Sequence, residues 1–226
     1  MGRFRVGIVI PALNESATIA EVVGAASKYG VAIVVNDGSI DATATLAEQA
    51  SAEVVSHDEN RGYDAALNTG FQRAVEIGCD VIITMDADGQ HDPTLIQKFI
   101  DRIYDGADVV SGVRSKRQRL AEHAFAWYTN LRFGLHDPLC GMKAYKVEVY
   151  RAQGYFDAYG SIGTALTIYA ALNGYKIDEV PFVVRDRHGV SRFGHVIAGN
   201  YRIFRAMIYS ICREKRVRIG IGSEQR

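Results

Sequence analysis

Residues 82–93 place two carboxylates directly after an apolar run, and they read Ile-Ile-Thr-Met-Asp-Ala-Asp-Gly-Gln-His-Asp-Pro. Asp86 and Asp88 are two positions apart, so at the end of a strand their side chains can point the same way. Oxygen ligands of this kind suit Mg²⁺ or Mn²⁺ rather than zinc, and an ion held there could neutralise a diphosphate leaving group. The same residues also fit a turn that uses Asp and Gly for its backbone and then caps a helix at Asp92-Pro93. Spacing alone does not choose between the two.

Length and composition fit one α/β domain with some additions. The chain has 226 residues, of which 48% are hydrophobic and 23% are charged, and this is enough to bury a sizeable core. Lys plus Arg balance Asp plus Glu at 26 each, so we expect no nucleic-acid partner. The three cysteines, Cys79, Cys140 and Cys212, lie far apart and predict ordinary buried thiols in a reducing cytoplasm. The N-terminus lacks the apolar segment of a signal peptide, so export is not predicted.

Short apolar runs alternate with amphipathic segments through the first half of the chain. The pattern predicts strands at 4–10, 31–35, 54–55, 81–84 and 109–113. It predicts helices after a Ser16 cap and at 41–51, 64–77 and 94–104. This alternation is typical of parallel β-α-β units with right-handed crossovers. We therefore expect an α/β fold, a doubly wound, mostly parallel sheet with helices on both faces.

Polar residues follow three of the predicted strands. The three segments are Pro11-Ala12-Leu13-Asn14-Glu15, Asn36-Asp37-Gly38-Ser39 and Asp86-Ala87-Asp88. Ligands of such sheets bind outside the carboxyl ends of the strands, so the three loops should converge on one rim. Helix capping explains a single loop as well, and better for Ser39 and Asp41, but it explains three loops together poorly. No GxGxxG follows the first strand and no GxxxxGK[ST] occurs, so the dinucleotide and P-loop phosphate cradles are missing.

Five segments in order match motifs of one known family. They are VIPALNE at 9–15, VNDGSID at 35–41, NRGYDAALNTG at 60–70, DADGQ at 86–90 and DPLCGMKAY at 137–145. The chain resembles the family 2 glycosyltransferases of the GT-A fold, and within them the polyprenyl-phosphate (dolichyl-phosphate) sugar synthases, over residues 4–194. DADGQ corresponds to the DxD motif of this family.

The resemblance implies an inverting glycosyltransferase that moves a sugar from a UDP- or GDP-sugar to an acceptor, most naturally a polyprenyl phosphate. It implies Mg²⁺ or Mn²⁺ held by Asp86, Asp88 and Gln90, and Asp88, Asp137 and Arg114 as catalytic residues. The implied donor-binding residues are Pro11, Ala12, Asn14, Glu15, Asp37, Gly62 and Asp86. The implied residues for the acceptor phosphate are Arg114, Arg187, Ser191 and Arg192.

Two of these roles depend on the acceptor. A phosphate monoester is already ionised near neutral pH, since its second pKa is about 6, and it needs no strong base. A hydroxyl acceptor would need one, and Asp137 is the candidate, although next to Pro138 it also fits a residue that only shapes a turn. Arg114 resembles the family arginine that meets phosphate, and the alternative is a solvated surface arginine.

The second half departs from the family pattern at several positions. Glu122 and Ala126 stand where relatives usually have a basic residue and a serine, and Ala165 stands where an acid is usual. In the block at 185–194, Arg192 replaces a lysine, and either Arg185 or Arg187 can supply the upstream arginine. The identity of the acceptor is therefore less well determined than that of the donor.

The C-terminal segment predicts a basic amphipathic helix. We divide the chain into a GT-A domain at 1–194, with a nucleotide-sugar half at 1–113 and an acceptor half at 114–194, and a helix with its tail at 195–226. An apolar stripe has helical spacing and consists of Ile197, Tyr201, Phe204, Ile208 and Ile211. The stripe can lie on an anionic membrane through 197–218, or pack on the domain itself or on a second subunit of a homo-oligomer. No stretch is long enough to span a bilayer, so we expect a cytoplasmic protein, peripheral on the membrane if the stripe binds there.

Two functions of other classes remain open on the sequence. A nucleotidyltransferase also uses an α/β sheet, acids and Mg²⁺, but the glycine-rich basic loop after its first strand is missing here. A catalytically weak sugar-nucleotide-binding partner subunit would explain the missing acid at Ala165. Nucleoside diphosphate release that needs metal and Asp88 would favour the glycosyltransferase.

Overall fold

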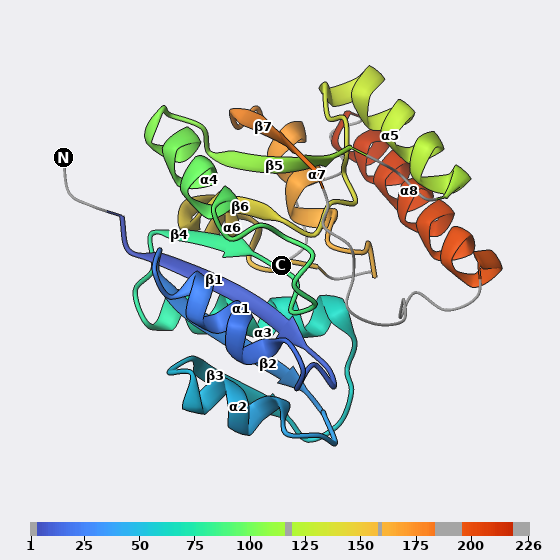
Figure 1. Cartoon of the computed structure of the whole chain (residues 1–226). Helices are drawn as coiled ribbons and strands as arrows, with labels where there is room; N and C mark the ends of the chain where they lie inside the picture. Colours follow the sequence, from blue (N-terminus) through green and yellow to red (C-terminus); the bar gives the residue numbers. More distant parts are fainter. Residues whose placement is uncertain (1–3, 116–118, 158–159, 184–195, 219–226) are drawn as a thin grey trace.

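The computed structural model describes residues 4–115, 119–157, 160–183 and 196–218 and has a seven-stranded sheet at its centre (Figure 1). The strands are β1 (Val6–Ala12), β2 (Val31–Asp37), β3 (Glu53–His57), β4 (Val81–Thr84), β5 (Val109–Arg114), β6 (Lys143–Lys146) and β7 (Ile177–Phe182). The helices are α1 (Ile19–Ala26), α2 (Thr43–Gln49), α3 (Tyr63–Glu76), α4 (Leu95–Tyr104), α5 (Leu120–Phe133), α6 (Val147–Gln153), α7 (Ala165–Leu172) and α8 (Val196–Arg218).

The sheet is mostly parallel, as the sequence predicts. Its order is β3-β2-β1-β4-β6-β5-β7, and β6 alone pairs antiparallel, with β4 on one side and β5 on the other. The pattern did not predict β6, because four residues reading Lys-Ala-Tyr-Lys form no apolar run. It did not predict β7 either, which contains Pro181 and lies at the edge of the sheet, where proline is tolerated.

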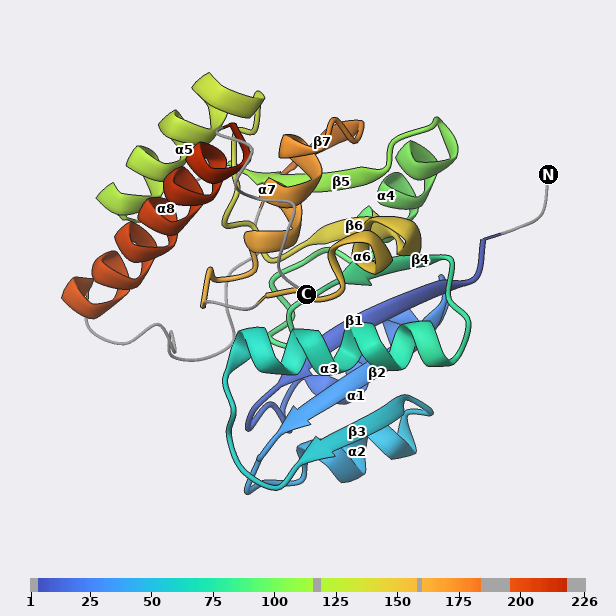
Figure 2. The same ribbon diagram turned by 180° about the vertical axis from the view of Figure 1, so that it is seen from behind.

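Helices cover both faces of the sheet. Alternate residues of the buried strands point to opposite faces, so Ile8 and Val34 pack against α1, α2 and α4. Val9 and Ile33 face the other way and pack against α3, α6 and α7. Figure 1 shows α1, α2 and α4 in front of the sheet, and Figure 2 shows α3, α6 and α7 on the reverse. The doubly wound architecture is confirmed.

The boundaries of several elements differ from the prediction near the strand ends. β1 ends at Ala12 and β2 continues to Asp37, so both strands reach further toward the rim than expected. Ser16 is not the cap of α1: the residue before that helix is Thr18, which makes no side-chain capping bond. α2 begins at Thr43 rather than at Asp41. Asp41 still bonds to the first residue of α2, and it also accepts a hydrogen bond from Ser16 N in the loop after β1.

α5 and α8 lie side by side beyond the end of β5 (Figures 1 and 2). Ala121 N donates to Asn200 Oδ1 at 3.3 Å near the start of both helices, and Tyr128 OH donates to Glu214 Oε2 at 2.7 Å further along, so the helices run in the same direction. Ile203 packs with Phe125 in a small core between them. The C-terminal helix is therefore anchored through α5.

The apolar stripe of α8 is not the face that packs inward. Ile203, Ala206 and Ser210 are buried, whereas Phe204 and Ile208 are exposed. Tyr201 of the same stripe is also exposed. The expectation that the stripe packs on the domain is therefore wrong for these residues, because a different side of the helix makes that contact.

Two further expectations from the sequence concern the burial of the cysteines and membrane-spanning helices. Cys79 and Cys140 are buried free thiols, but Cys212 is exposed on α8, so the prediction of three buried thiols fails at that position. Among the described residues, no helix has the length and apolar character that crossing a bilayer requires.

Candidate functional site

The loops after β1 and β2 are tied together by hydrogen bonds between side chains and backbone. Asn14 N donates to Ser39 Oγ at 2.9 Å, and Ile40 N donates back to Asn14 Oδ1 at 2.9 Å. Glu15 N donates to Thr43 Oγ1 at 2.8 Å. Asn14 has a positive φ of 51°, a conformation that asparagine tolerates better than most residues. The two loops therefore form one structured rim at the carboxyl ends of the strands.

The last residues of β1 and Asp41 complete this rim. Pro11 and Ala12 pair with β2, and Ala12 is buried, so its contribution to a ligand would come from its backbone. Asp41 accepts Ser16 N at 3.2 Å and Thr43 N at 3.0 Å. Burial opposes the charge on Asp41, but hydrogen bonds from the side chains of Thr43 and Ser16, followed by those from their backbone N–H groups, lower its pKa to about 2. Asp41 thus accepts the first N–H of α2, as a capping residue would, and also holds the loop at Ser16.

Asp37 lies at the end of β2 and fixes the loop before α3. Its Oδ1 accepts Arg61 N at 2.9 Å and its Oδ2 accepts Gly62 N at 2.8 Å. His57 Nδ1 lies 2.7 Å from Asp37 Oδ1, and His57 Nε2 lies 2.9 Å from Thr69 Oγ1. A carboxylate offers about four lone-pair positions, so three protein donors leave room for a ligand. Asp37 and Gly62, both predicted at the site, are in direct contact.

Asp86 and Asp88 follow β4 at the same rim. Asp86 Oδ1 accepts the hydroxyl of Tyr63 at 3.2 Å, and Asp86 N lies 3.4 Å from His91 Nδ1. Asp88 is buried, and its Oδ1 accepts Gln90 N at 3.1 Å. Asp88 therefore does stabilise a turn, as the alternative interpretation of this segment expects. Asp86 instead uses its carboxylate in a contact with another loop.

The chemistry of these donors fits a divalent cation. Asp86, Asp88 and Gln90 offer hard oxygen atoms from one loop, and the Asp86 side chain is partly exposed. The described residues contain no group of three or more His, Cys, Asp or Glu side chains arranged for a metal. Mg²⁺ sites in nucleotide enzymes commonly use one or two carboxylates and complete their shell with substrate phosphates and water. Two carboxylates and an amide fit that kind of site.

Arg114 closes β5 and forms a buried ion-pair network. Its Nε lies 2.7 Å from Asp137 Oδ2 and its Nη2 lies 2.9 Å from Asp137 Oδ1. Glu122 is 3.5 Å from Arg114 and 3.7 Å from Arg119. Burial disfavours the charge on Arg114, but the bonds to Asp137 outweigh this and raise the pKa of Arg114 above its usual value. Arg114 is thus not the solvated surface arginine of the alternative interpretation.

The geometry argues against Asp137 as a general base. Its carboxylate is buried, and both oxygens are bound to the Arg114 guanidinium, while Arg114 N also donates to Oδ2 at 3.1 Å. A base must have a free lone pair within reach of the acceptor proton, and a bidentate arginine occupies the best positions. Asp137 instead orients Arg114.

A second buried network links α3 to the loop before α7. Asp64 Oδ1 accepts Gly163 N at 2.8 Å. Burial, followed by the charge of Asp157, raises the pKa of Asp64 to about 6. Lys143 Nζ donates to Pro138 O at 2.8 Å and Gly163 O at 2.7 Å, and burial lowers its pKa to about 8. This network joins the start of α3, which follows Gly62, to the loop that carries Asp137.

Of the remaining predicted positions, Glu122 belongs to the Arg114 network, and Ala126 and Ala165 make none of the contacts described above. Glu122 and Ala126 are buried on α5, and Ala165 is buried at the first position of α7. Arg185, Arg187, Ser191 and Arg192 lie outside the described residues.

Comparison with known proteins shows the family to which the chain belongs. The model of glycosyl transferase family 2 matches residues 7–152, which include both acidic loops and the Arg114–Asp137 pair. The chain belongs to glycosyl transferase family 2. It is therefore a glycosyltransferase, as the five motifs predicted.

Two relatives of this glycosyltransferase are named for lipid-phosphate chemistry. The chain is 32% identical to the dolichyl-phosphate hexose transferase of Haloferax volcanii, with 83% of each chain covered. It is 31% identical to the polyprenol monophosphomannose synthase of Mycolicibacterium smegmatis, covering 82% of this chain and 79% of the relative. The resemblance to polyprenyl-phosphate sugar transferases is thus confirmed.

A solved structure confirms the GT-A-type fold. Glucosyl-3-phosphoglycerate synthase from Mycobacterium tuberculosis, determined with Mg²⁺ and UDP, has a TM-score of 0.74 at 20% identity. The match covers 92% of this chain and 79% of the other. At this identity the likeness concerns the fold alone.

Sequence reasoning missed several residues that the structure places in the networks of the candidate site. His57 looked like one of six scattered histidines, and Tyr63, Asp64 and Lys143 lie inside matched motifs without an assigned role. Their importance comes from contacts with residues far along the chain, for which a single sequence carries no local signal. The one available hint is that Tyr63 and Asp64 directly follow Gly62, which the motif already implied.

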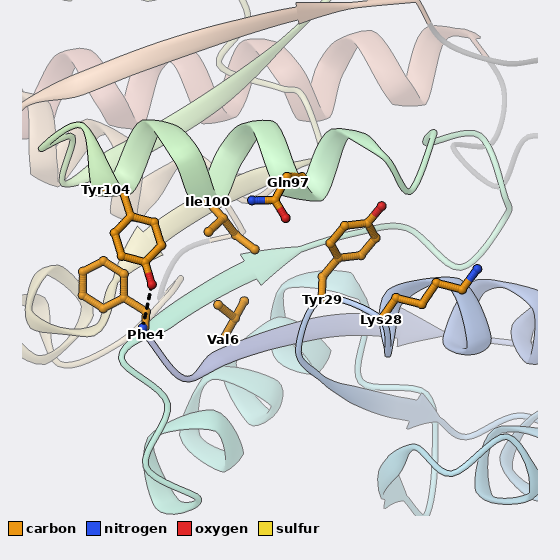
Figure 3. A pocket seen from close by; sticks show the side chains of 7 residues that line it. All are labelled: Phe4, Val6, Lys28, Tyr29, Gln97, Ile100 and Tyr104. Carbon is orange, nitrogen blue, oxygen red and sulfur yellow. Dashed lines mark hydrogen bonds between the residues drawn. The ribbon is translucent and has the colours of Figure 1, made fainter. Parts of the chain in front are cut away.

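A cavity beside the start of β1 is not part of this site. A cavity of about 80 Å³ is lined by Phe4, Val6, Tyr29, Ile100 and Tyr104, among others, between α4 and the start of β1 (Figure 3). It lies at the amino end of β1, whereas the site lies beyond the carboxyl ends of the strands.

Proposed function

We propose that the protein transfers a sugar from a UDP- or GDP-sugar to a polyprenyl phosphate, with inversion at the anomeric carbon and with Mg²⁺ or Mn²⁺. The observation that carries the proposal is the placement of three groups at one rim: the Asp37 loop, the Asp86–Asp88 loop and the Arg114–Asp137 pair. The names of the two lipid-phosphate relatives support the acceptor class.

The donor is proposed to lie across the ends of β1, β2 and β4. Asp37 would meet the nucleoside, and Asp86, Asp88 and Gln90 would hold the cation beside the diphosphate. The cation would offset the negative charge of the departing nucleoside diphosphate. The remaining contacts are assigned to Pro11, Ala12, Asn14, Glu15 and Gly62.

The acceptor phosphate is proposed to bind at Arg114. One phosphate oxygen attacks the anomeric carbon while the bond from that carbon to the diphosphate breaks, and the nucleoside diphosphate leaves. The acceptor is already ionised, since its second pKa is about 6, so the step needs no proton acceptor. This agrees with Asp137 being engaged by Arg114. We assign Arg187, Ser191 and Arg192 to the same phosphate on the motif alone.

The acceptor would come from a membrane, and we propose that 197–218 makes peripheral contact with its cytoplasmic face. The exposed stripe of α8 includes Tyr201, at 68% exposure, and Ile208, at 55%. α5 adds exposed Trp127 and Leu131, four residues apart on one side of that helix. Tyrosine and tryptophan favour the boundary between lipid and water. Glu122 on the inner side of α5 contacts Arg114, so the helix that carries Trp127 and Leu131 also reaches the proposed phosphate site.

The membrane contact can be tested with the intact protein and anionic vesicles. Replacing Phe204 and Ile208 together by serine should abolish sedimentation with phosphatidylglycerol vesicles, because it removes apolar side chains from the proposed contact surface. Both side chains are exposed, so the replacement should leave the core packing intact. Ile40→Ser is the matched control, since Ile40 is 95% exposed but lies on the loop after β2. Equal sedimentation of the double variant and the wild type would rule out this surface.

We also propose that 1–194 is the catalytic domain, with 1–113 binding the nucleotide-sugar and 114–194 the acceptor, and that 195–226 serves attachment. Family membership argues against a nucleotidyltransferase. A weakly active partner subunit would bind the donor without turning it over.

The decisive experiment incubates a panel of UDP- and GDP-sugars with polyprenyl phosphate and Mn²⁺. We expect one nucleoside diphosphate released for each lipid-linked sugar formed, with the opposite anomeric configuration by NMR. Removing Mn²⁺ or introducing Asp88→Asn should lower the rate by about 100-fold or more, as when charge stabilisation of a transition state is lost. Pyrophosphate release, or donor binding without any turnover, would contradict the proposal.

A further inference from the structure

Tyr63 is the first residue of α3 and is not part of the predicted ligand set. It is 38% exposed, yet its hydroxyl is turned toward the metal loop and donates to Asp86 Oδ1 at 3.2 Å. The two residues are 23 positions apart, so the contact joins two loops of the rim. Tyr63 therefore touches the more exposed of the two carboxylates at which we propose the cation binds.

Hydrogen bonds from the backbone before Tyr63 to Asp37, at the proposed nucleoside side of the site, set the position of Tyr63. Gly62 has a φ of 92°, which glycine adopts without the strain that other residues would have, and its N–H donates to Asp37 Oδ2. Asp37 also accepts Arg61 N. Because Asp37 fixes the two residues before Tyr63, the position of the phenol depends on the same carboxylate that is proposed to meet the nucleoside.

The opposite side of Asp86 is closed by Gly141. A Cβ at Gly141 would lie 2.5 Å from Asp86 Oδ2, closer than side-chain carbons approach other atoms. Gly141 is itself held, because Thr84 Oγ1 donates to Gly141 O at 2.6 Å. Asp86 thus lies between a hydroxyl on one oxygen and a close backbone on the other. Its carboxylate has little freedom to rotate, and lone pairs remain for a cation.

We propose that Tyr63 is a positioning residue for the cation site: its hydroxyl holds Asp86 in the orientation that binds Mn²⁺ or Mg²⁺. The inference rests on the proposed function, since it assumes a cation at Asp86 and Asp88. A neutral phenol is a poor ligand for these ions, so Tyr63 acts through Asp86. It also connects the nucleoside end of the donor site with the diphosphate end.

The test measures nucleotide binding by the full chain rather than activity. Equilibrium dialysis with labelled UDP and GDP gives the Mn²⁺ concentration for half-maximal binding. We expect Tyr63→Phe to raise this concentration about 10-fold or more, because partners of metal ligands typically contribute a factor of about 10–100 in metal affinity. Excess Mn²⁺ should restore full nucleotide binding, since the variant keeps every proposed ligand.

Tyr104→Phe is the matched control. Tyr104 also loses one hydroxyl contact, the bond that it accepts from Phe4 N at 2.9 Å, but it does so in the cavity at the other end of β1 (Figure 3). We expect it to bind nucleotide as the wild type does. Thermal unfolding of both variants shows whether either change affects the fold instead.

The outcomes separate this inference from the proposed function. If Asp88→Asn abolishes Mn²⁺-dependent nucleotide binding and Tyr63→Phe leaves it unchanged, the role of Tyr63 is refuted and the metal site stands. If excess Mn²⁺ fails to rescue Tyr63→Phe, the phenol contacts the nucleotide itself and the positioning role is also refuted. If the wild type binds nucleotide equally well without Mn²⁺, the proposed function fails and the inference fails with it.

Discussion

The proposed donor rim, made of the loops after β1, β2 and β4, and the proposed acceptor side around Arg114 are built from different kinds of contact. On the donor rim, side-chain oxygens accept hydrogen bonds from the backbone of neighbouring loops, as Asp37 does from Gly62 and Asp41 from Ser16. On the acceptor side, the partly exposed Arg114 is held by two buried charged side chains, Asp137 and Glu122. The geometry of a site held by backbone hydrogen bonds depends on the path of the main chain. The geometry of a site held by ion pairs depends on the charge and shape of each side chain.

This difference implies different sensitivities. Replacements that move the backbone or crowd it should damage the donor rim most, while the acceptor side should respond to the shape of a single cation. Asp64 joins the two regions, because it lies on α3 and holds the loop before α7 that Lys143 also contacts.

The largest effect is expected from crowding the donor rim. Gly141→Ala should lower the rate of nucleoside diphosphate release by about 100-fold, because the new Cβ displaces Asp86 and a shift of about 1 Å in a reacting group can cost that much. Gly24→Ala is the control, since a Cβ there meets nothing within 4 Å in the middle of α1. Equal rates for the two variants would show that Asp86 need not be fixed.

The next effect concerns the junction between the regions. The pKa of Asp64 is raised to about 6, so the folded protein binds a proton there more tightly than the unfolded chain does. Its contribution to stability is therefore largest below pH 4 and declines as the pH rises through 6. The unfolding free energy of Asp64→Asn minus that of the wild type should therefore rise by about 2–3 kcal/mol from pH 4 to pH 7, at 1.36 kcal/mol for each pKa unit.

Urea unfolding at a series of pH values measures this difference. Asp41→Asn serves as the comparison, because the pKa of Asp41 is lowered to about 2 and its stabilisation is lost only as the pH falls below 4. A constant difference between Asp64→Asn and the wild type over pH 4–7 would contradict the assignment.

A smaller effect is expected from changing the shape of the cationic side chain at Arg114, where we propose that the acceptor phosphate binds. Arg114→Lys keeps the charge beside Asp137 but loses the planar guanidinium that holds it by two bonds. Transfer to polyprenyl phosphate should fall by about 10-fold, equal to about 1.4 kcal/mol, while Mn²⁺-dependent nucleotide binding stays unchanged. Arg102→Lys, whose partner Asp178 is largely exposed, should change neither. Loss of nucleotide binding in Arg114→Lys would mean that the two regions are not separable.

The smallest effect on stability should come from the outer surface of α8. Phe204→Ser is expected to change the unfolding free energy by no more than about 0.5 kcal/mol, as exposed positions generally do. Ile203→Ala, on the buried side of the same helix, should cost about 2–5 kcal/mol. Equal costs in urea unfolding would show that the exposed stripe is covered in solution.

The same contrast explains what could be predicted from the sequence. Strand and helix alternation predicted the parallel part of the sheet, and contiguous motifs predicted the loops at its rim, because the residues that form each loop lie within one motif. β6 was missed because Lys143 and Tyr145 are buried through distant partners rather than by an apolar run. The pairing of Arg114 with Asp137 spans 23 positions, and its effect on the base role of Asp137 was not visible in either motif.

The most direct test of the account is a crystal structure with Mn²⁺ and UDP or GDP bound, with anomalous scattering recorded at the manganese edge. We predict an anomalous peak bridged by Asp86, Asp88 and the nucleotide diphosphate, with Tyr63 still bonded to Asp86. A bound diphosphate with no peak at that loop, and with both carboxylates engaged only by protein groups, would contradict the central claim.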